Sequence, residues 1–446
     1  MKILIPAKKG EWRVFLTAFA VTFLTYLIYQ VLRNAKAALV VTSAANGAMA
    51  IPHIQLKMLL PTSIVLTWIL TQLMRRFSAA KVFMVTTAAF LSYFVVFAVW
   101  LFDFRDQPVV YYSFFTMCEL WKVAVVAILF WGFLNRHLLL EQAKRFYAAL
   151  AFASSIGMLA AGPVSLYCMH TLSHTLHPLS KDPWHHALLM VGVVVGLAGV
   201  AIMALFAQLV NLLGEQTNDR VVEKRERLTV SGSVRTLFES RYLRTLAAIL
   251  FFDYIAFNLG EIAFMGVLKE AYPDPNLFGI YMSWLNMAGA VGTLLMTLFL
   301  APILLRRCPW VVSAVATPFA YGLSAAAFFG TLLLGVGLPI AVTTGSCMFI
   351  FSRVGKLGLL DPAKELAFVP LSDEMQVKGK LIIDGLVGRF GRAGSSVIAI
   401  SLQTLPWITF VVGACTAIWL RATLSLGKQI SVGEFVDQDM ARVGQE

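Results

Sequence analysis

Long apolar stretches, each about as long as a membrane-crossing helix, recur along the whole chain. A helix needs roughly 20 apolar residues to cross the hydrocarbon core of a bilayer. The pattern predicts an all-α polytopic membrane protein with twelve transmembrane helices. The predicted spans lie near residues 12–32, 51–74, 82–102, 109–135, 146–168, 187–213, 245–268, 279–302, 310–334, 339–356, 381–404 and 406–426.

The composition supports the membrane class independently of the pattern. Of the 446 residues, 59% are hydrophobic and 13% are charged, and the mean hydropathy is +0.77. A soluble protein carries about 25% charged residues, roughly twice this share. The first apolar run has no small-residue cleavage site after it, so we expect a retained helix and not a signal peptide. Soluble globular classes are excluded.

The basic residues are unevenly distributed between the two sides of the predicted helices. Twelve spans place both termini on one side of the membrane. With that side cytoplasmic, 27 of the 36 Lys and Arg residues fall in cytoplasmic segments and five in external ones. Basic residues are retained in the cytoplasm during insertion. Both termini are therefore predicted to be cytoplasmic.

A long charged connection, residues 214–244, lies midway between six spans on each side. We expect an N-terminal six-helix bundle at 1–213, a cytoplasmic linker at 214–244 and a C-terminal six-helix bundle at 245–446. Two such bundles joined by a basic linker are the plan of the major facilitator superfamily, whose substrate sites lie near mid-membrane. A twelve-span exporter of another type gives a similar hydropathy pattern.

Ionisable residues within the predicted spans are candidates for function. Each costs about 2.5–3.5 kcal/mol at mid-bilayer, so such residues normally face a partner or a watery cavity. Glu119 and Lys122 lie three residues apart on one helix face, and they either neutralise each other or act on a substrate. Asp253 and Glu261 either pair with bases on other helices or take part in transport. The spans hold Lys57, Glu119, Lys122, Asp253, Glu261, Asp384, Arg389 and Arg392.

Two of these charges, Arg389 and Arg392, lie in a segment where glycines recur at every third residue, Gly388, Gly391 and Gly394. Small residues at this spacing allow another helix to approach closely. Guanidinium groups bind phosphate through two parallel hydrogen bonds, so a pair of intramembrane arginines suits an anionic ligand. A purely structural arginine pair is the alternative.

Signatures of enzymes are absent from the sequence. It contains no HExxH, GxSxG, P-loop or GxGxxG motif. We expect no enzymatic activity, no cofactor and no metal site, although His170, His174 and His177 have a helical metal spacing. A membrane enzyme that acts on lipid or glycan phosphates needs an acid, base or metal constellation that is not evident. The net charge of +12 comes mostly from the cytoplasmic segments, so no nucleic-acid partner is expected.

Seven segments of the sequence carry recognisable motifs, and their order and spacing cover nearly the whole chain. They are Val31–Thr42, Ile51–Pro52, Met117–Trp121, Leu129–Asn135, Asn258–Glu261, Asp361–Leu371 and Val377–Gly394. Together these segments resemble the nucleotide transporter family, the ATP/ADP translocases of obligate intracellular bacteria and plastids, and the chain resembles a divergent member.

The resemblance implies a secondary transporter that imports nucleotides, with four charged positions critical for transport. Two of these positions are matched by Glu119 and Glu261. A third, a lysine in the family, is Gln55 here, with Lys57 two residues later. The fourth is Arg392 in place of a lysine.

Further departures from the family pattern bear on the substrate. The lysine of the first motif is kept as Lys36, but the acid after it is Ala37. The small residue usual after the Glu-Leu-Trp segment is Lys122, and our hypothesis is that it restores the positive charge missing at Gln55. These changes weaken the expectation of strict ATP/ADP exchange.

The sequence therefore predicts alternating access with a nucleotide substrate such as ATP, ADP or NAD, in a phospholipid membrane. The location is predicted to be the inner membrane of a bacterium, and the protein is expected to act as a monomer. A proton-coupled nucleotide symporter and a facilitator-type carrier or exporter of another organic anion are the alternatives. The predicted substrate-binding residues are Lys36, Gln55, Lys57, Glu119, Lys122, Glu261, Arg389 and Arg392.

Overall fold

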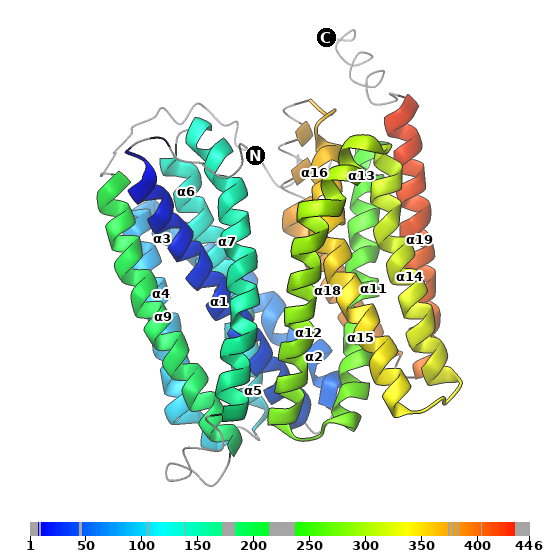
Figure 1. The fold of residues 1–446 in the computed structure, drawn as a ribbon, viewed down its shortest axis with the longest axis horizontal. Helices are drawn as coiled ribbons and strands as arrows, with labels where there is room; N and C mark the ends of the chain where they lie inside the picture. The colour runs from blue at the N-terminus through cyan, green and yellow to red at the C-terminus, as the bar shows by residue number, and fades with distance from the viewer. Residues whose placement is uncertain are drawn as a thin grey trace. The chain divides into compact units, whose positions relative to one another are not determined.

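Helices account for all the regular secondary structure in the residues that the structure describes (Figure 1). The structure is a computed structural model. It describes residue 8 and residues 10–43, 47–104, 107–138, 140–171, 183–213, 237–372, 375–376, 379–380, 383–402 and 404–432. The chain forms two compact units: unit 1 contains Met1–Arg220 and Tyr272–Ala290, and unit 2 contains Val221–Ala271 and Val291–Glu446.

Unit 1 is built around α1, which buries most of its length. Gly157 of α7 shows how closely its neighbours approach, because a Cβ there would lie 2.4 Å from the carbonyl oxygen of Phe23. The helices are α1 (Trp12–Ser43), η2 (Gly47–Met49), α2 (Ala50–Ile54), η3 (Gln55–Leu59), α3 (Leu60–Arg76), α4 (Ala79–Val99), η4 (Leu101–Phe104), α5 (Pro108–Trp121), η5 (Lys122–Phe130), α6 (Trp131–His137), α7 (Leu140–Leu166), η6 (Tyr167–Thr171), α9 (Pro183–Leu213) and, as far as Ala290, α12 (Pro275–Leu295).

Unit 2 is built around α11, which packs against α15, α18 and α19. Tyr321 of α14 donates a hydrogen bond to the carbonyl oxygen of Ala256 in α11, at 2.6 Å. The helices are α11 (Arg241–Ala271), η7 (Met296–Leu300), α13 (Ala301–Arg307), α14 (Trp310–Leu333), α15 (Leu338–Gly355), η8 (Lys356–Leu360), α16 (Asp361–Phe368), η9 (Ile383–Val387), α18 (Gly388–Ser401) and α19 (Leu405–Val432).

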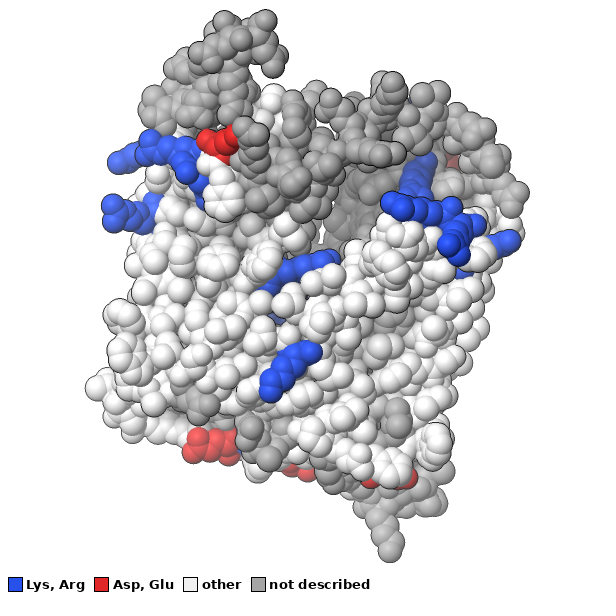
Figure 2. Space-filling view, turned by 180° about the vertical axis from the view of Figure 1, so that it is seen from behind, with Lys and Arg blue, Asp and Glu red and all other residues white. Residues whose placement is uncertain are grey.

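Within the described ranges, 11 helices or helix runs are long and apolar enough to cross a membrane. Large apolar side chains such as Trp68, Leu197 and Phe319 point outward from them. Figure 2 shows a face on which most residues are neither acidic nor basic, with a few basic side chains in the upper part and the middle of the view. Such a surface suits contact with lipid over the middle of the helices.

Eleven of the twelve predicted spans correspond to these candidates, and the exception is 381–404. There η9 and α18 run from Ile383 to Ser401 and carry Asp384, Arg389 and Arg392, so the segment is less apolar than the others. The predicted linker lies outside the described residues as far as residue 236. Its last four residues already belong to α11.

Two predicted span ends are wrong, and both errors concern charged residues. The first helix continues beyond residue 32 to Ser43, so Lys36 lies within a helix and not in an external segment. The tenth continues beyond residue 356 through η8 and α16, so Lys356, which was counted with the cytoplasmic bases at the end of its span, lies well inside a helical run. Each of these charges is neutralised by a carboxylate on another helix of its own unit, so neither charge ends its helix.

Six π-helical segments interrupt the α-helices of the described chain, and they recur in matching order. In the first half of the sequence, η3, η5 and η6 lie in the second, fourth and fifth helix runs. In the second half, η7 and η8 lie in the second and fourth helix runs of that half, and η9 lies in its fifth predicted span. Such segments are rare and occur frequently at functional sites. Two of them begin with a lysine, Lys122 or Lys356.

Candidate functional site

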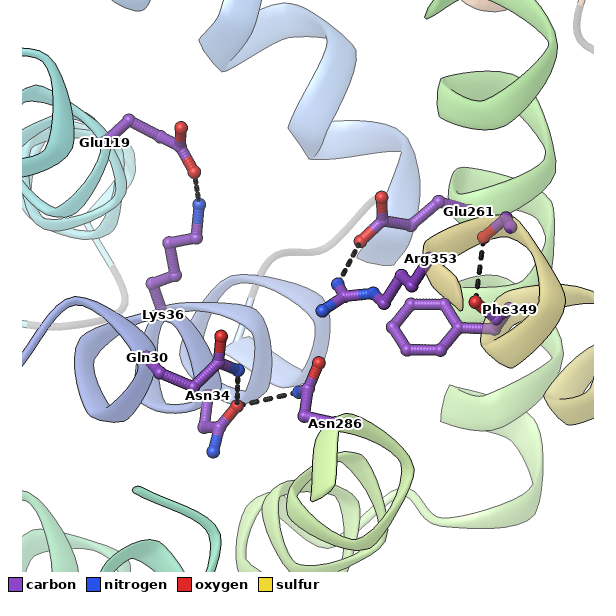
Figure 3. Close-up of polar contacts among 9 residues, drawn as sticks. Gln30, Asn34, Lys36, Glu119, Glu261, Asn286, Phe349 and Arg353 are labelled. Carbon is purple, nitrogen blue, oxygen red and sulfur yellow. Dashed lines mark hydrogen bonds and ion pairs between the residues drawn. The ribbon is translucent and has the colours of Figure 1, made fainter. Parts of the chain in front are cut away.

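An ion pair joins two helices of unit 1. The Lys36 ammonium on α1 donates to the Glu119 carboxylate on α5 (Figure 3). The two side chains are only 7% and 16% exposed. The Lys36 Nζ also lies 4.1 Å from the centre of the Phe115 ring. Glu119 is therefore neutralised by a base on another helix.

Lys122 is not the ion-pair partner of Glu119, contrary to one interpretation of their spacing. Its side chain is exposed, and its Nζ lies 5.2 Å from the centre of the Tyr29 ring on α1. In the part of the chain that the structure describes, Lys122 forms no ion pair. An ammonium over an aromatic face keeps its charge available to a further anion.

Gln55 and Lys57 lie together in η3, which packs against α5, the helix of Glu119. Pro52 precedes this segment and Pro61 follows it. Proline removes a backbone donor and disturbs the regular hydrogen-bond ladder of a helix. The Lys57 side chain is exposed and has no ion-pair partner among the described residues.

A buried network of amides and hydroxyls lies near the middle of α1 and was not anticipated from the sequence. The Asn34 Oδ1 accepts from Gln30 Nε2 at 3.1 Å and from Asn286 Nδ2 at 2.8 Å (Figure 3). The Asn34 Nδ2 donates to the hydroxyls of Ser165 and Ser283 at 3.1 and 3.2 Å. Two amides four residues apart in an apolar helix were the signal for such a network.

Unit 2 holds a second interhelical ion pair. Here the acid lies on the earlier helix and the base on the later one, the reverse of the pair in unit 1. Glu261 lies on α11 and Arg353 on α15, with Oε1 and Nη2 3.6 Å apart (Figure 3). The Arg353 guanidinium lies 4.2 Å from the centre of the Phe349 ring on its own helix. Pairing of Glu261 with a base on another helix, one of the two interpretations from the sequence, is thus observed.

A further ion pair in unit 2 involves a completely buried acid. The Asp253 side chain is 0% exposed, and its Oδ2 accepts from Lys356 Nζ at 2.5 Å. Its other oxygen, Oδ1, is buried without a hydrogen-bond partner in the described structure. The Lys356 Nζ also lies 3.8 Å from the centre of the Tyr254 ring. Arg353 and Lys356 were missed because they stand at the end of the predicted span 339–356 and were counted with the cytoplasmic bases.

The two predicted phosphate-binding arginines lie on α18, against α11. The Arg392 Nε donates to the carbonyl oxygen of Gly388 at 3.3 Å, and its guanidinium lies 5.7 Å from the Tyr254 ring centre. Neither Arg389 nor Arg392 has an ion-pair partner within the described ranges. Their positive charges are therefore not neutralised by a neighbouring described carboxylate.

The glycine ridge of α18 allows this close approach, as its spacing predicted. A Cβ on Gly391 would lie 2.8 Å from the Cβ of Tyr254 and 3.2 Å from the carbonyl oxygen of Phe251. A Cβ on Gly388 would lie 2.9 Å from the Tyr254 ring. These contacts hold Tyr254 against α18, beside Arg392.

We expect Gly391→Ala to lower the thermal stability of the protein. The new methyl group would meet the Phe251 carbonyl oxygen and the Tyr254 Cβ, neither of which can rotate away. Overpacking of this kind lowers folding stability by about 1–3 kcal/mol. Thermal unfolding of the purified protein in detergent is the measurement. Gly413→Ala is the matched control, because no atom lies within 4 Å of its new methyl group. Equal melting temperatures for the two variants would contradict the close packing.

The described residues define an all-α polytopic membrane protein whose helices resemble those of major-facilitator-like folds. A solved structure of a bacterial homologue of the iron transporter ferroportin, in its inward-facing state, is similar at a TM-score of 0.64. That similarity covers 93% of this chain and 99% of the other, at 14% identity, and supports the fold alone.

The chain belongs to the TLC ATP/ADP transporter family, whose model matches residues 1–107 and 107–430. It is 27% identical to ADP,ATP carrier protein 2 of Chlamydia trachomatis, covering 96% of this chain and 88% of the relative. It is 28% identical to the chloroplastic ADP,ATP carrier protein 1 of Arabidopsis thaliana, covering 90% and 72%. The resemblance found in the sequence motifs is thereby confirmed, and the chain is a divergent member of a transporter family.

Proposed function

We propose that the protein is a secondary transporter that imports nucleotides by alternating access, with ATP, ADP or a dinucleotide such as NAD as substrate. One observation carries the proposal. Lys122 lies within a candidate membrane helix, and Arg389 and Arg392 lie within the helical run from Ile383 to Ser401, yet none of the three has an ion-pair partner in the described structure. Charges at such positions normally face a partner or a substrate pathway.

The chemistry of these cations suits a phosphate ligand. Arg389 and Arg392 each present a planar fork of donors that matches phosphate oxygens, and Lys122 adds a compact charge. The names of the relatives, ADP,ATP carrier proteins, agree with a substrate that bears several phosphates. Arg392 stands at one of the four charged family positions, which also supports its role.

The two family carboxylates have a role in the substrate-free protein. Glu119 neutralises Lys36, and Glu261 neutralises Arg353. A substrate phosphate competes with each carboxylate for its base, so binding and the release of an interhelical contact are linked. Such competition provides a way to make helix movement depend on substrate. Gln55 and Lys57, on η3 against α5, complete the proposed substrate-binding set.

The orientation in the membrane is part of the same proposal. We place the protein in a bacterial inner membrane with both termini cytoplasmic, on the strength of the Lys and Arg distribution. Import then means movement from the external face to the side of the basic loops.

A competition experiment tests the function. The protein, expressed in a bacterial host, is offered labelled ATP or labelled NAD, with an excess of unlabelled ATP, ADP, NAD or a non-nucleotide organic anion. We expect at least one nucleotide to be taken up and to be displaced only by nucleotides. An uncoupler should leave uptake intact for an exchanger and abolish it for a proton symporter. Uptake displaced by the organic anion alone would instead indicate a different facilitator-type carrier.

A further inference from the structure

The two units contain the same arrangement of a tyrosine and a lysine. In unit 1, Lys122 is the first residue of a π-helical segment and lies over the ring of Tyr29. In unit 2, Lys356 is the first residue of a π-helical segment and lies over the ring of Tyr254. The lysines come from the fourth helix run of each half of the sequence, and the tyrosines from the first.

The spacing of the neighbouring charges makes the correspondence specific. Seven residues separate Tyr29 from Lys36, and seven separate Tyr254 from Glu261. Three residues separate Glu119 from Lys122 in unit 1. Three likewise separate Arg353 from Lys356 in unit 2. Each unit thus holds an interhelical ion pair and, three residues further on, a lysine stacked on a tyrosine. Lys356 is the counterpart of Lys122.

The two arrangements differ at one position, the residue before the tyrosine. The residue before Tyr254 is Asp253, which binds Lys356, whereas the residue before Tyr29 is Ile28, which is buried and apolar. Lys122 consequently has a tyrosine face and no carboxylate, and Lys356 has both. The two lysines hold corresponding positions, but Asp253 neutralises the charge of Lys356, whereas no carboxylate neutralises that of Lys122 in the described structure.

We propose that Lys356 is a further phosphate-binding cation of the transporter and that Asp253 weakens its hold on the substrate. The inference rests on the proposed nucleotide transport. An ammonium has three donors, and Asp253 takes one of them, so the others remain for a phosphate oxygen. The Lys356 side chain is 20% exposed, which leaves it accessible, while Asp253 is fully enclosed.

The state of the Asp253 carboxylate argues against a purely structural ion pair. A buried ion pair stabilises a fold only when further hydrogen bonds satisfy its remaining lone pairs. In the described residues, the Asp253 Oδ1 has no such bond. Two hydrophobic residues of similar volume would serve the fold at least as well. The pair is better explained by a lysine that must be present and an acid that moderates it.

Binding to the purified full-length protein in detergent tests the inference, with ATP and inorganic pyrophosphate as probes in titration calorimetry. We expect Asp253→Asn to lower the Kd of both probes at least threefold, because the lysine loses its competing anion. In Asp253→Asn/Lys356→Met the gain should disappear and the Kd should rise at least tenfold above that of the natural chain. Ile28→Asp should raise the Kd at least threefold relative to Ile28→Asn.

The outcomes separate the inference from the function on which it rests. An unchanged or higher Kd in Asp253→Asn, with an unchanged melting temperature, would overturn the role of Lys356. Should that variant not be recovered folded, equal Kd values for Ile28→Asp and Ile28→Asn would overturn the inference. Failure of the natural chain to bind ATP would contradict the nucleotide function instead, and the pyrophosphate series would still decide on Lys356.

Discussion

A Lys122→Met variant is expected to bind nucleotide at least tenfold more weakly than the natural chain while keeping its fold. The methionine retains the apolar stem that packs over Tyr29 and removes only the charge. Because Lys122 neutralises no described carboxylate, its loss leaves no buried acid uncompensated. A hydrogen bond to a charged group contributes about 1.5–3 kcal/mol, which corresponds to a change in Kd of about ten- to more than a hundredfold.

Calorimetric titration of the purified protein with ATP, ADP and NAD measures this effect, and thermal unfolding without ligand reports on the fold. Lys81→Met is the matched control, because Lys81 is exposed in the first turn of α4. The control should bind nucleotide as the natural chain does. A Lys122→Met protein with unchanged affinity would remove Lys122 from the site and, with it, the idea that it replaces the charge missing at Gln55.

A Lys356→Met variant is expected to lose about 3–5 kcal/mol of folding stability. The change leaves the Asp253 carboxylate, which is fully buried, without the ammonium that neutralises it. A lone buried charge is far less stable than either a pair or no charge at all. In Asp253→Asn/Lys356→Met the charge is removed as well, so most of the lost stability should return.

Unfolding in detergent by heat or denaturant measures the loss. The same substitution at Lys380 is the control, because Lys380 pairs with Glu365 where the side chains are 44% and 49% exposed. Exposed ion pairs contribute about 0–1 kcal/mol, so Lys380→Met should change stability little. Equal losses of folding stability in Lys356→Met and Lys380→Met would show that an unpaired carboxylate at Asp253 costs no more stability than an unpaired surface carboxylate.

The membrane helices were largely predictable, because their apolar length is a property of each segment alone. Eleven of the predicted spans have counterparts among the candidate membrane helices. The close approach of α18 to α11 was also predictable, since Gly388, Gly391 and Gly394 recur at a helical spacing. Family membership followed from local motifs such as Met117–Trp121.

The partners of the charged residues were not predictable, because they come from other helices. The sequence spacing suggested Lys122 as the ion-pair partner of Glu119. In the structure the partner of Glu119 is Lys36, which lies 83 residues away. Similarly, Lys356 is 103 residues from Asp253. Only the packing of helices shows that such residues meet, and hydropathy had placed Lys36 outside the spans and Lys356 at the very end of one.

The π-helical segments escaped prediction for a different physical reason. They differ from the α-helix in the register of backbone hydrogen bonds, and residue type influences that register only weakly. Nothing in Lys122–Phe130 marks the change. The correspondence between Lys122 and Lys356 therefore became visible only with the backbone.

The opposite polarity of the two interhelical ion pairs determines which helices of the two halves can pair with one another. In α1 and α5 the base comes first, and in α11 and α15 the acid comes first. A change from one order to the other passes through two like charges or a lone charge inside the membrane. That intermediate is strongly disfavoured, so reversing either pair requires both residues to change together or a compensating charge beside them. The helices of the two halves are thus not interchangeable, because a chimera with α11 in place of α1 would set Glu261 against Glu119.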